Sequence, residues 1–131
     1  MAREVHTHLM FEGHAQDAMR LYTSLFPDSE ILEVQEYAEG EHGDEGSVKV
    51  ARFTIGGRLF LCIDSPVSHD FTFTPSMSIY VECESEGELD EAFGRLADQG
   101  EVLMPLDDYG FSTKFGWLRD RFGVSWQLNL R

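Results

Sequence analysis

The chain has 131 residues, 42% of them hydrophobic, and its 24 acidic and 10 basic residues give a net charge of −14. This charge repels the phosphates of nucleic acids and of anionic membranes, so we expect neither as a partner. No apolar run approaches the roughly 18 residues of a membrane span, and residues 1–4 lead into a strand rather than a signal peptide. We therefore expect one cytoplasmic domain with an ordinary core.

The first half of the sequence predicts one strand, one helix and three further strands. Residues 5–11 alternate, with Leu9 and Phe11 on one face of the strand and His8 and Met10 on the other. Apolar residues at helical spacing follow over 15–26, and this helix is expected to stop at Pro27. The next strands are expected over residues 30–35, 48–55 and 59–63, the last two joined by a Gly-Gly hairpin turn.

The second half repeats this order of elements. A strand over 77–83 precedes a helix that Ser85 and Glu88 begin as a capping box and that Gly100 is expected to close. The remaining strands are expected over residues 101–104, 114–119 and 124–130. The chain is thus predicted to be an α+β protein in which βαβββ occurs twice, once over 1–66 and once over 76–131, within a single domain 1–131.

The last predicted strand has two distinct faces. Val124, Trp126 and Leu128 fall on one side, whereas Ser125, Gln127 and Asn129 fall on the other. Strict alternation indicates a sheet with one packed apolar face and one polar face. We expect this polar face to line a ligand site.

Three segments carry a family resemblance: residues 9–22 (LMFEGHAQDAMRLY), 25–29 (LFPDS) and 116–127 (GWLRDRFGVSWQ). Together they resemble the vicinal oxygen chelate superfamily, and within it the PhnB-like group named after 3-demethylubiquinone-9 3-methyltransferase. The resemblance implies a curled mixed and antiparallel sheet that forms a cup with the helices outside, and pairing of two chains as a homodimer. Methyl transfer is not expected, because the glycine-rich run 40–46 is acidic and no helix is predicted after it.

In metal-dependent members of that superfamily, the ligands come from inward positions on the first and last strands of each half. By strand phase these positions fall at His6, near Leu61, at Ser76 or Ser78, and at Gln127. Of these residues, His6 is the one competent nitrogen ligand, whereas a catalytic metal needs about three good donors. We therefore expect no cofactor. The alternative is an enzyme of the lyase, isomerase or dioxygenase type that binds a divalent metal through His6, alone or together with His8.

The same phase argument gives a set of residues that would face a ligand in the cup: His6, His8, Met10, Ser78, Tyr80, Trp117, Arg119, Gln127 and Asn129. Trp117 would stack against a planar or apolar ligand, and Arg119 would hold a carboxylate or phosphate. The alternatives are structural roles without ligand binding, in which Trp117 fills the cup and residues 119–121 form a solvated turn. A general acid or base, if one exists, would be His6 or His8.

The leading hypothesis is a metal-free homodimer that binds a small organic molecule in an aromatic cup. Cys62 and Cys83 lie in apolar strands and are expected to be buried, reduced thiols. The acidic residues 36–46 are expected to form a mobile loop, because its glycines and its like charges disfavour one conformation.

Overall fold

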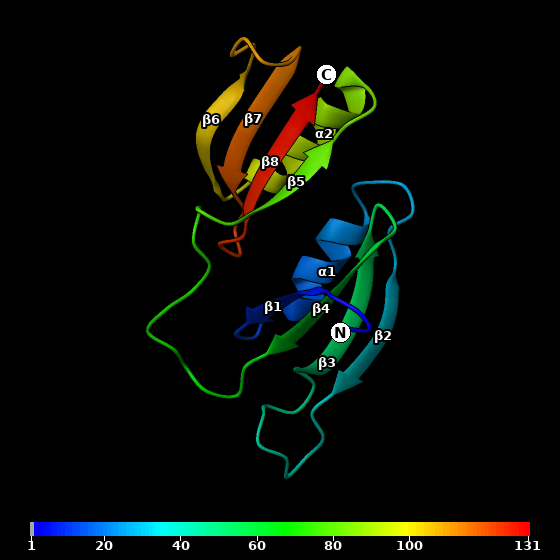
Figure 1. Cartoon of the computed structure of the whole chain (residues 1–131). Coiled ribbons are helices and arrows are strands. Elements are labelled where there is room, and N and C mark those ends of the chain that lie inside the picture. The colour runs from blue at the N-terminus through cyan, green and yellow to red at the C-terminus, as the bar shows by residue number, and fades with distance from the viewer. Residues whose placement is uncertain (1) are drawn as a thin grey trace. The chain divides into compact units, whose positions relative to one another are not determined.

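The structure, a computed structural model, describes residues 2–131 and divides into two compact units. The first unit ends at His69 and the second begins at Asp70. Each unit contains one helix and four strands in the order βαβββ (Figure 1). The repeat predicted from the sequence is therefore confirmed, and the fold class is α+β.

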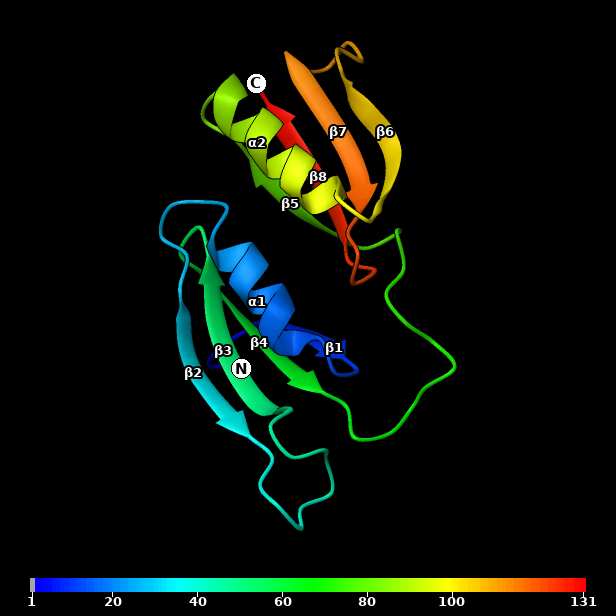
Figure 2. The same cartoon turned by 180° about the vertical axis from the view of Figure 1, so that it is seen from behind.

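Unit 1 is a mixed four-stranded sheet with one helix against it. Its strands lie in the order β1-β4-β3-β2, and β1 and β4 are the parallel pair. Figure 2 shows α1 along one face of this sheet. The elements are β1 (Thr7–Phe11), α1 (Ala15–Thr23), β2 (Ile31–Glu36), β3 (Val48–Ile55) and β4 (Arg58–Asp64).

The core of unit 1 lies between α1 and the sheet. Met19 and Tyr22 of α1 are fully buried, and Tyr22 packs near Phe53, which stacks on Phe60 with 5.4 Å between the ring centroids. The predicted apolar stripe of the helix is thus the packed one. The helix ends at Thr23, however, earlier than the apolar pattern up to residue 26 predicted.

Helix α1 is capped by a residue that is distant in the sequence. His14 stands at the N-cap position but makes no side-chain capping bond. Instead, Oδ1 of the buried Asp64 accepts hydrogen bonds from the backbone amides of Gly13 (2.8 Å) and Ala15 (3.0 Å), and its Oδ2 accepts one from Val48 (2.9 Å). A carboxylate at a helix N-terminus also favours the helix dipole. One side chain therefore joins α1, β3 and β4.

Unit 2 repeats the arrangement, with strand order β5-β8-β7-β6 and a parallel β5–β8 pair. The helix α2 covers one face of the sheet (Figure 2). Leu89 and Leu96 of α2 pack there with Trp126, all three with no exposed surface. The elements are β5 (Ser78–Glu82), α2 (Glu86–Ala97), β6 (Glu101–Asp107), β7 (Lys114–Arg119) and β8 (Ser125–Leu130).

The two ends of α2 differ in how well the sequence predicted them. At the start, Ser85 Oγ accepts the amide of Glu88 at 3.1 Å, as a capping box requires. The Glu88 carboxylate accepts the amide of Glu84 at 3.0 Å, one residue before the expected Ser85, so the box is formed in part. At the end, the expectation for Gly100 is wrong, because Gln99 and not Gly100 adopts the left-handed conformation, with φ of 59°. Gly100 is needed for a different reason: a Cβ there would overlap the carbonyl oxygen of Arg119.

The β7–β8 turn is built around a buried carboxylate. Asp120 is 3% exposed, so the alternative of a solvated turn at residues 119–121 is wrong for this residue. Its Oδ1 accepts the amides of Phe122 (2.8 Å) and Val124 (3.0 Å), and its Oδ2 accepts the indole N–H of Trp126 (2.9 Å). The turn is therefore fixed to the core of unit 2.

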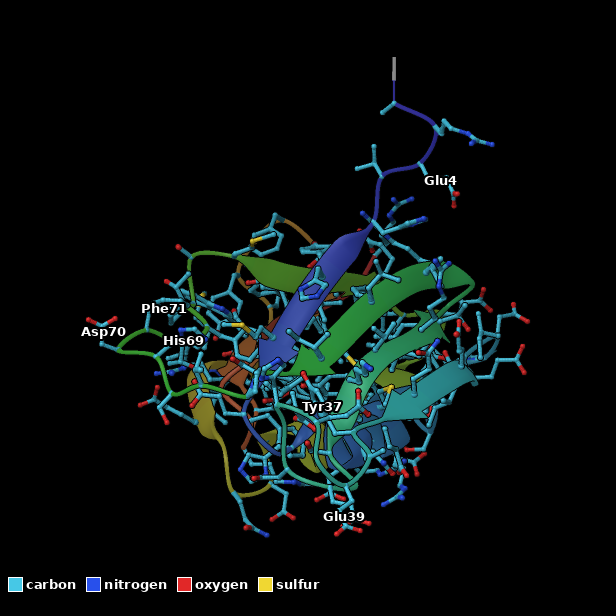
Figure 3. All side chains as sticks on the ribbon, turned by 90° about the horizontal axis from the view of Figure 1, so that it is seen from below. Glu4, Tyr37, Glu39, His69, Asp70 and Phe71 are labelled. Atoms are coloured by element: carbon cyan, nitrogen blue, oxygen red, sulfur yellow. The ribbon has the colours of Figure 1, made fainter. Side chains whose placement is uncertain are left out.

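The acidic loop between β2 and β3 is closed at its base. The Tyr37 amide donates to Ser47 O at 2.9 Å, the Tyr37 ring packs against Gly43, and Lys49 pairs with Glu41. Figure 3 shows Tyr37 near the sheet and Glu39 farther out on the loop, and it also marks Glu4 on the segment before β1. These bonds order the base of the loop, and its mobility stays a prediction.

Within residues 2–131, no helix has the length and apolar character needed to cross a bilayer. Cys62 and Cys83 are both buried and form no disulfide, as predicted.

Candidate ligand-binding face

The face of the unit 2 sheet that α2 does not cover is called the open face here. Gly116 on β7 identifies this face, because a Cβ at Gly116 would overlap Phe93 of α2 and therefore lies on the helix side of the sheet. Side chains alternate along a strand, so the residues on either side of Gly116 lie on the open face. Cross-strand pairing arranges nine side chains of this face in three rows. The first row is Ser78, Ser125 and Arg119, the middle row is Tyr80, Gln127 and Trp117, and the third row is Glu82, Asn129 and Phe115.

The first and middle rows are joined by hydrogen bonds that converge on Ser125. Ser125 is 1% exposed, and its Oγ accepts the Trp117 indole N–H at 2.9 Å and lies 2.6 Å from Ser78 Oγ. It also lies 3.3 Å from Pro75 O, which as a carbonyl can only accept. Ser125 therefore donates to Pro75, and Ser78 donates to Ser125.

Gln127 completes this chain in the middle row. Its Nε2 donates one hydrogen to Ser78 Oγ at 3.1 Å, which leaves the amide oxygen and the second N–H available. Gln127 thus lies on the open face, as the alternation of β8 predicted, and one of its two N–H groups bonds to the neighbouring strand. The network fixes the orientation of Gln127 and Trp117.

Two polar atoms of the open face are buried without a hydrogen-bond partner. They are Nε of Arg119 in the first row and Oδ1 of Asn129 in the third row. Asn129 is 4% exposed, and its Nδ2 donates to Glu82 Oε2 at 3.0 Å. Because an unpaired buried polar group costs about 1–3 kcal/mol, two of them on one face require an explanation.

Aromatic rings surround the third row. Phe115, which is buried, lies 5.1 Å from Phe111 and 6.1 Å from Tyr109 between ring centroids, and both of these contacts are edge-on. Tyr80 lies 6.4 Å from Phe115. Tyr80 and Phe111 are 49% and 62% exposed, so this end of the face offers apolar ring surface to a ligand.

The predicted site residues divide between the two units. Six of them share the open face: Ser78, Tyr80, Trp117, Arg119, Gln127 and Asn129. The other three, His6, His8 and Met10, belong to unit 1. There His8 pairs with Leu61 and Met10 with Ile63, on the face away from the buried Leu9 and Phe11. His6 precedes β1, and its Nε2 lies 2.9 Å from Glu4 Oε1.

Three residues of the open face were missing from the predicted set. Ser125 stood on the correct side of β8, but its role as the acceptor for Trp117 depends on β7 pairing with β8. Phe115 and Glu82 also follow from strand alternation on β7 and β5, once the register is known. The alternation of side chains along each strand could have identified these three residues, because each lies two positions from a residue of the predicted set.

Comparison with known proteins places this fold in a family. A sequence model described as 3-demethylubiquinone-9 3-methyltransferase matches residues 3–129. The chain belongs to this family. A solved structure described as a putative 3-demethylubiquinone-9 3-methyltransferase, PhnB protein, from Bacillus cereus is 56% identical to this chain. That structure has a TM-score of 0.96, over 98% of this chain and 100% of that one.

Two further solved structures extend the comparison. Protein PA1353 from Pseudomonas aeruginosa is 25% identical, with a TM-score of 0.86 over 99% of this chain and 98% of its own. A point mutant of the fosfomycin resistance protein FosX from Listeria monocytogenes, complexed with Mn(II) and a dihydroxypropylphosphonic acid, is 16% identical to this chain. Its TM-score is 0.64 over 98% of this chain and 93% of its own. The likeness to FosX concerns the fold alone. No curated protein matches the chain.

In this member of the 3-demethylubiquinone-9 3-methyltransferase family, the residues at the four predicted ligand positions do not suit a transition metal ion. Leu61 has no donor atom, and the Ser78 hydroxyl and the Gln127 amide bind each other. In residues 2–131, no three or more His, Cys, Asp and Glu side chains gather in a group able to hold an ion. The open face instead presents hydroxyl, amide, guanidinium and aromatic groups.

Three protonation states bear on this chemistry. Burial, then the nearby Glu82 carboxylate, raises the pKa of Tyr80 above its usual value, although Arg131 opposes the shift, so the phenol stays a donor at neutral pH. Burial raises the pKa of both the Cys62 and the Cys83 thiols to about 12. Thiols of this kind are poor nucleophiles at neutral pH, because the thiolate is the reactive form.

Proposed function

We propose that this chain binds a small organic molecule on the open face of unit 2, without a catalytic metal. One observation carries the proposal: Arg119 Nε and Asn129 Oδ1 are buried on that face with no partner. A ligand that accepts from Arg119 and donates to Asn129 would satisfy both atoms. Between them, the half-buried Trp117 offers ring surface and the Gln127 oxygen offers an acceptor.

The fold favours binding without methyl transfer. Both sheets are mixed, with one parallel pair each, and β3 rather than a helix follows the glycine-rich segment 40–46. A nucleoside-methyl donor is usually held by a parallel α/β sheet whose glycine-rich turn opens a helix. The proposal predicts that incubation with labelled S-adenosylmethionine transfers no methyl group.

Gln127→Ala is the variant that tests the binding site. A screen of small aromatic acids, amines and amides by saturation-transfer NMR would first identify a binder of the wild-type protein. Gln127→Ala should then weaken that binder by about 1–3 kcal/mol, the usual loss when a buried partner is removed. Its melting temperature should change little, because Gln127 lies outside the core of Trp126 and Leu128.

The matched control is Gln16→Ala, which removes the same side chain from α1 in unit 1. It should leave the affinity for the same binder unchanged. Equal affinities for wild type and Gln127→Ala would contradict the proposed site. Elemental analysis of the purified protein is the second test: a stoichiometric transition metal that disappears in His6→Ala would contradict metal-free binding.

We also propose that the chain acts as a homodimer in the cytoplasm. Each sheet has two edge strands, and β2 is an edge with Ile31, Leu32 and Val34 at least 38% exposed. Uncovered edges with apolar side chains are usually protected by pairing. The two free, buried cysteines are those of a reducing compartment. A monomeric mass in light scattering at micromolar concentration would contradict the dimer.

A further inference from the structure

The first row of the open face has a cation that lacks an anion. Among residues 2–131, no carboxylate forms an ion pair with Arg119, and the nearest one in sequence, Asp120, already accepts three hydrogen bonds. The two serines of this row bind each other and Pro75. The unsatisfied group at this end is therefore a donor with a permanent positive charge.

The third row is the opposite case, because its unsatisfied groups are acceptors. Asn129 Oδ1 has no partner, and the neighbouring Glu82 carboxylate uses only Oε2, which accepts from Asn129 Nδ2 and lies 3.5 Å from Arg131 Nε. The Arg131 side chain is 85% exposed, so water screens most of that ion pair. An amide oxygen beside a carboxylate is suited to an N–H donor, above all a cationic one.

The two ends are separated by a defined length of sheet. Arg119 and Phe115, and likewise Ser125 and Asn129, are four residues apart along β7 and β8, which corresponds to about 13 Å at the usual rise of a strand. The middle row between them contains the rings of Trp117 and Tyr80. The face is thus ordered as cationic donor, ring surface, and anionic acceptor.

From this order we infer that the ligand is dipolar, with an anionic group that binds Arg119 and an ammonium or similar N–H group that binds Asn129 and Glu82. An apolar or planar section joins the two ends across Trp117. This inference rests on the proposed function and names the class of ligand for the same site. It also agrees with the net charge of −14, which repels a simple anion at long range but not a zwitterion.

Three probes of equal chain length test the inference by isothermal titration calorimetry: ω-aminooctanoate, octanoate and octylamine. The dipolar probe should bind at least about tenfold more tightly than either singly charged probe, because it gains one further charge-assisted hydrogen bond. In a parallel NMR titration, the Trp117 indole N–H signal should shift with each probe that binds, which would show that the measured heat comes from binding at the open face.

Two variants assign the ends. In Arg119→Gln, ω-aminooctanoate should bind no more tightly than octylamine, whereas the matched control Arg121→Gln, an exposed arginine of the same turn, should behave as wild type. In Glu82→Gln, which leaves the buried Asn129 in place, the advantage of ω-aminooctanoate over octanoate should fall severalfold.

The outcomes separate this inference from the proposed function. If octanoate or octylamine shifts the Trp117 signal and binds as tightly as ω-aminooctanoate, the open face binds ligands but the dipolar inference is wrong. If none of the probes binds, or the Trp117 signal does not move in any titration, both the inference and its assignment to this face are overturned.

Discussion

Removal of the Asp120 carboxylate should destabilise unit 2 more than any surface substitution. Asp120→Ala leaves three donors without their acceptor: the amides of Phe122 and Val124 and the indole N–H of Trp126. A buried unpaired donor costs about 1–3 kcal/mol, and the two turn amides regain some water in the variant, so we expect a loss of about 3–5 kcal/mol. For a domain stable by about 5–15 kcal/mol, this loss is a large fraction.

Asp120→Asn separates the contributions. The amide keeps one oxygen for the two turn amides, but its NH₂ group faces the Trp126 indole donor, so we expect about 1–3 kcal/mol. The assay is guanidinium unfolding followed by tryptophan fluorescence, which reports on unit 2 because both tryptophans lie there. Asp108→Ala is the control, since its exposed carboxylate accepts one turn amide, that of Gly110. A loss below about 1 kcal/mol for Asp120→Ala would refute the reasoning.

Three other predictions concern the core and the buried thiols. Asp64→Ala should cost unit 1 about 3–5 kcal/mol in denaturant, because three backbone amides lose their acceptor; a change below 1 kcal/mol would be inconsistent with its role as the cap of α1. Gly116→Ala should destabilise unit 2 by about 1–3 kcal/mol, because the new methyl group overlaps Phe93 of α2. Gly94→Ala, which adds a methyl group in open space on α2, should stabilise unit 2 by about 0.5–1 kcal/mol. Changes in unfolding free energy of the same sign for both variants would contradict this packing. Burial raises the pKa of Cys62 and Cys83 from 9.0 to about 12, so folding favours the neutral thiols. The stability that these thiols contribute should be complete below pH 9 and should be lost as the pH rises toward 12. Native protein that reacts with a thiol reagent at pH 8 as fast as unfolded protein would argue against this burial.

Local periodicity predicted much of this fold. The alternation of residues 124–130 placed Trp126 and Leu128 in the core and Gln127 on the open face, and the structure agrees on each. The Ser85 cap was equally predictable, because both of its partners lie within one helical turn. In each case a single element determines the pattern.

The features that the sequence left unpredicted depend on contacts between elements. Asp64 caps a helix that lies 49 residues earlier, and Asp120 is buried by an indole from the next strand. Gly100 looked like a helix terminator but is small because β7 passes close to it. The unpaired atoms of Arg119 and Asn129 could not be predicted either, since lack of a partner depends on every neighbour in space.

The central claim is that a small molecule binds on the open face, and the two tryptophans test it with a built-in control. Trp117 lies on the open face, whereas Trp126 is fully buried on the α2 side of the same sheet. In a ¹⁵N-edited NMR titration with a binder from the fragment screen, the Trp117 indole signal should shift in proportion to occupancy while the Trp126 signal stays in place. A saturable binder that moves neither signal, or Trp126 alone, would contradict the account.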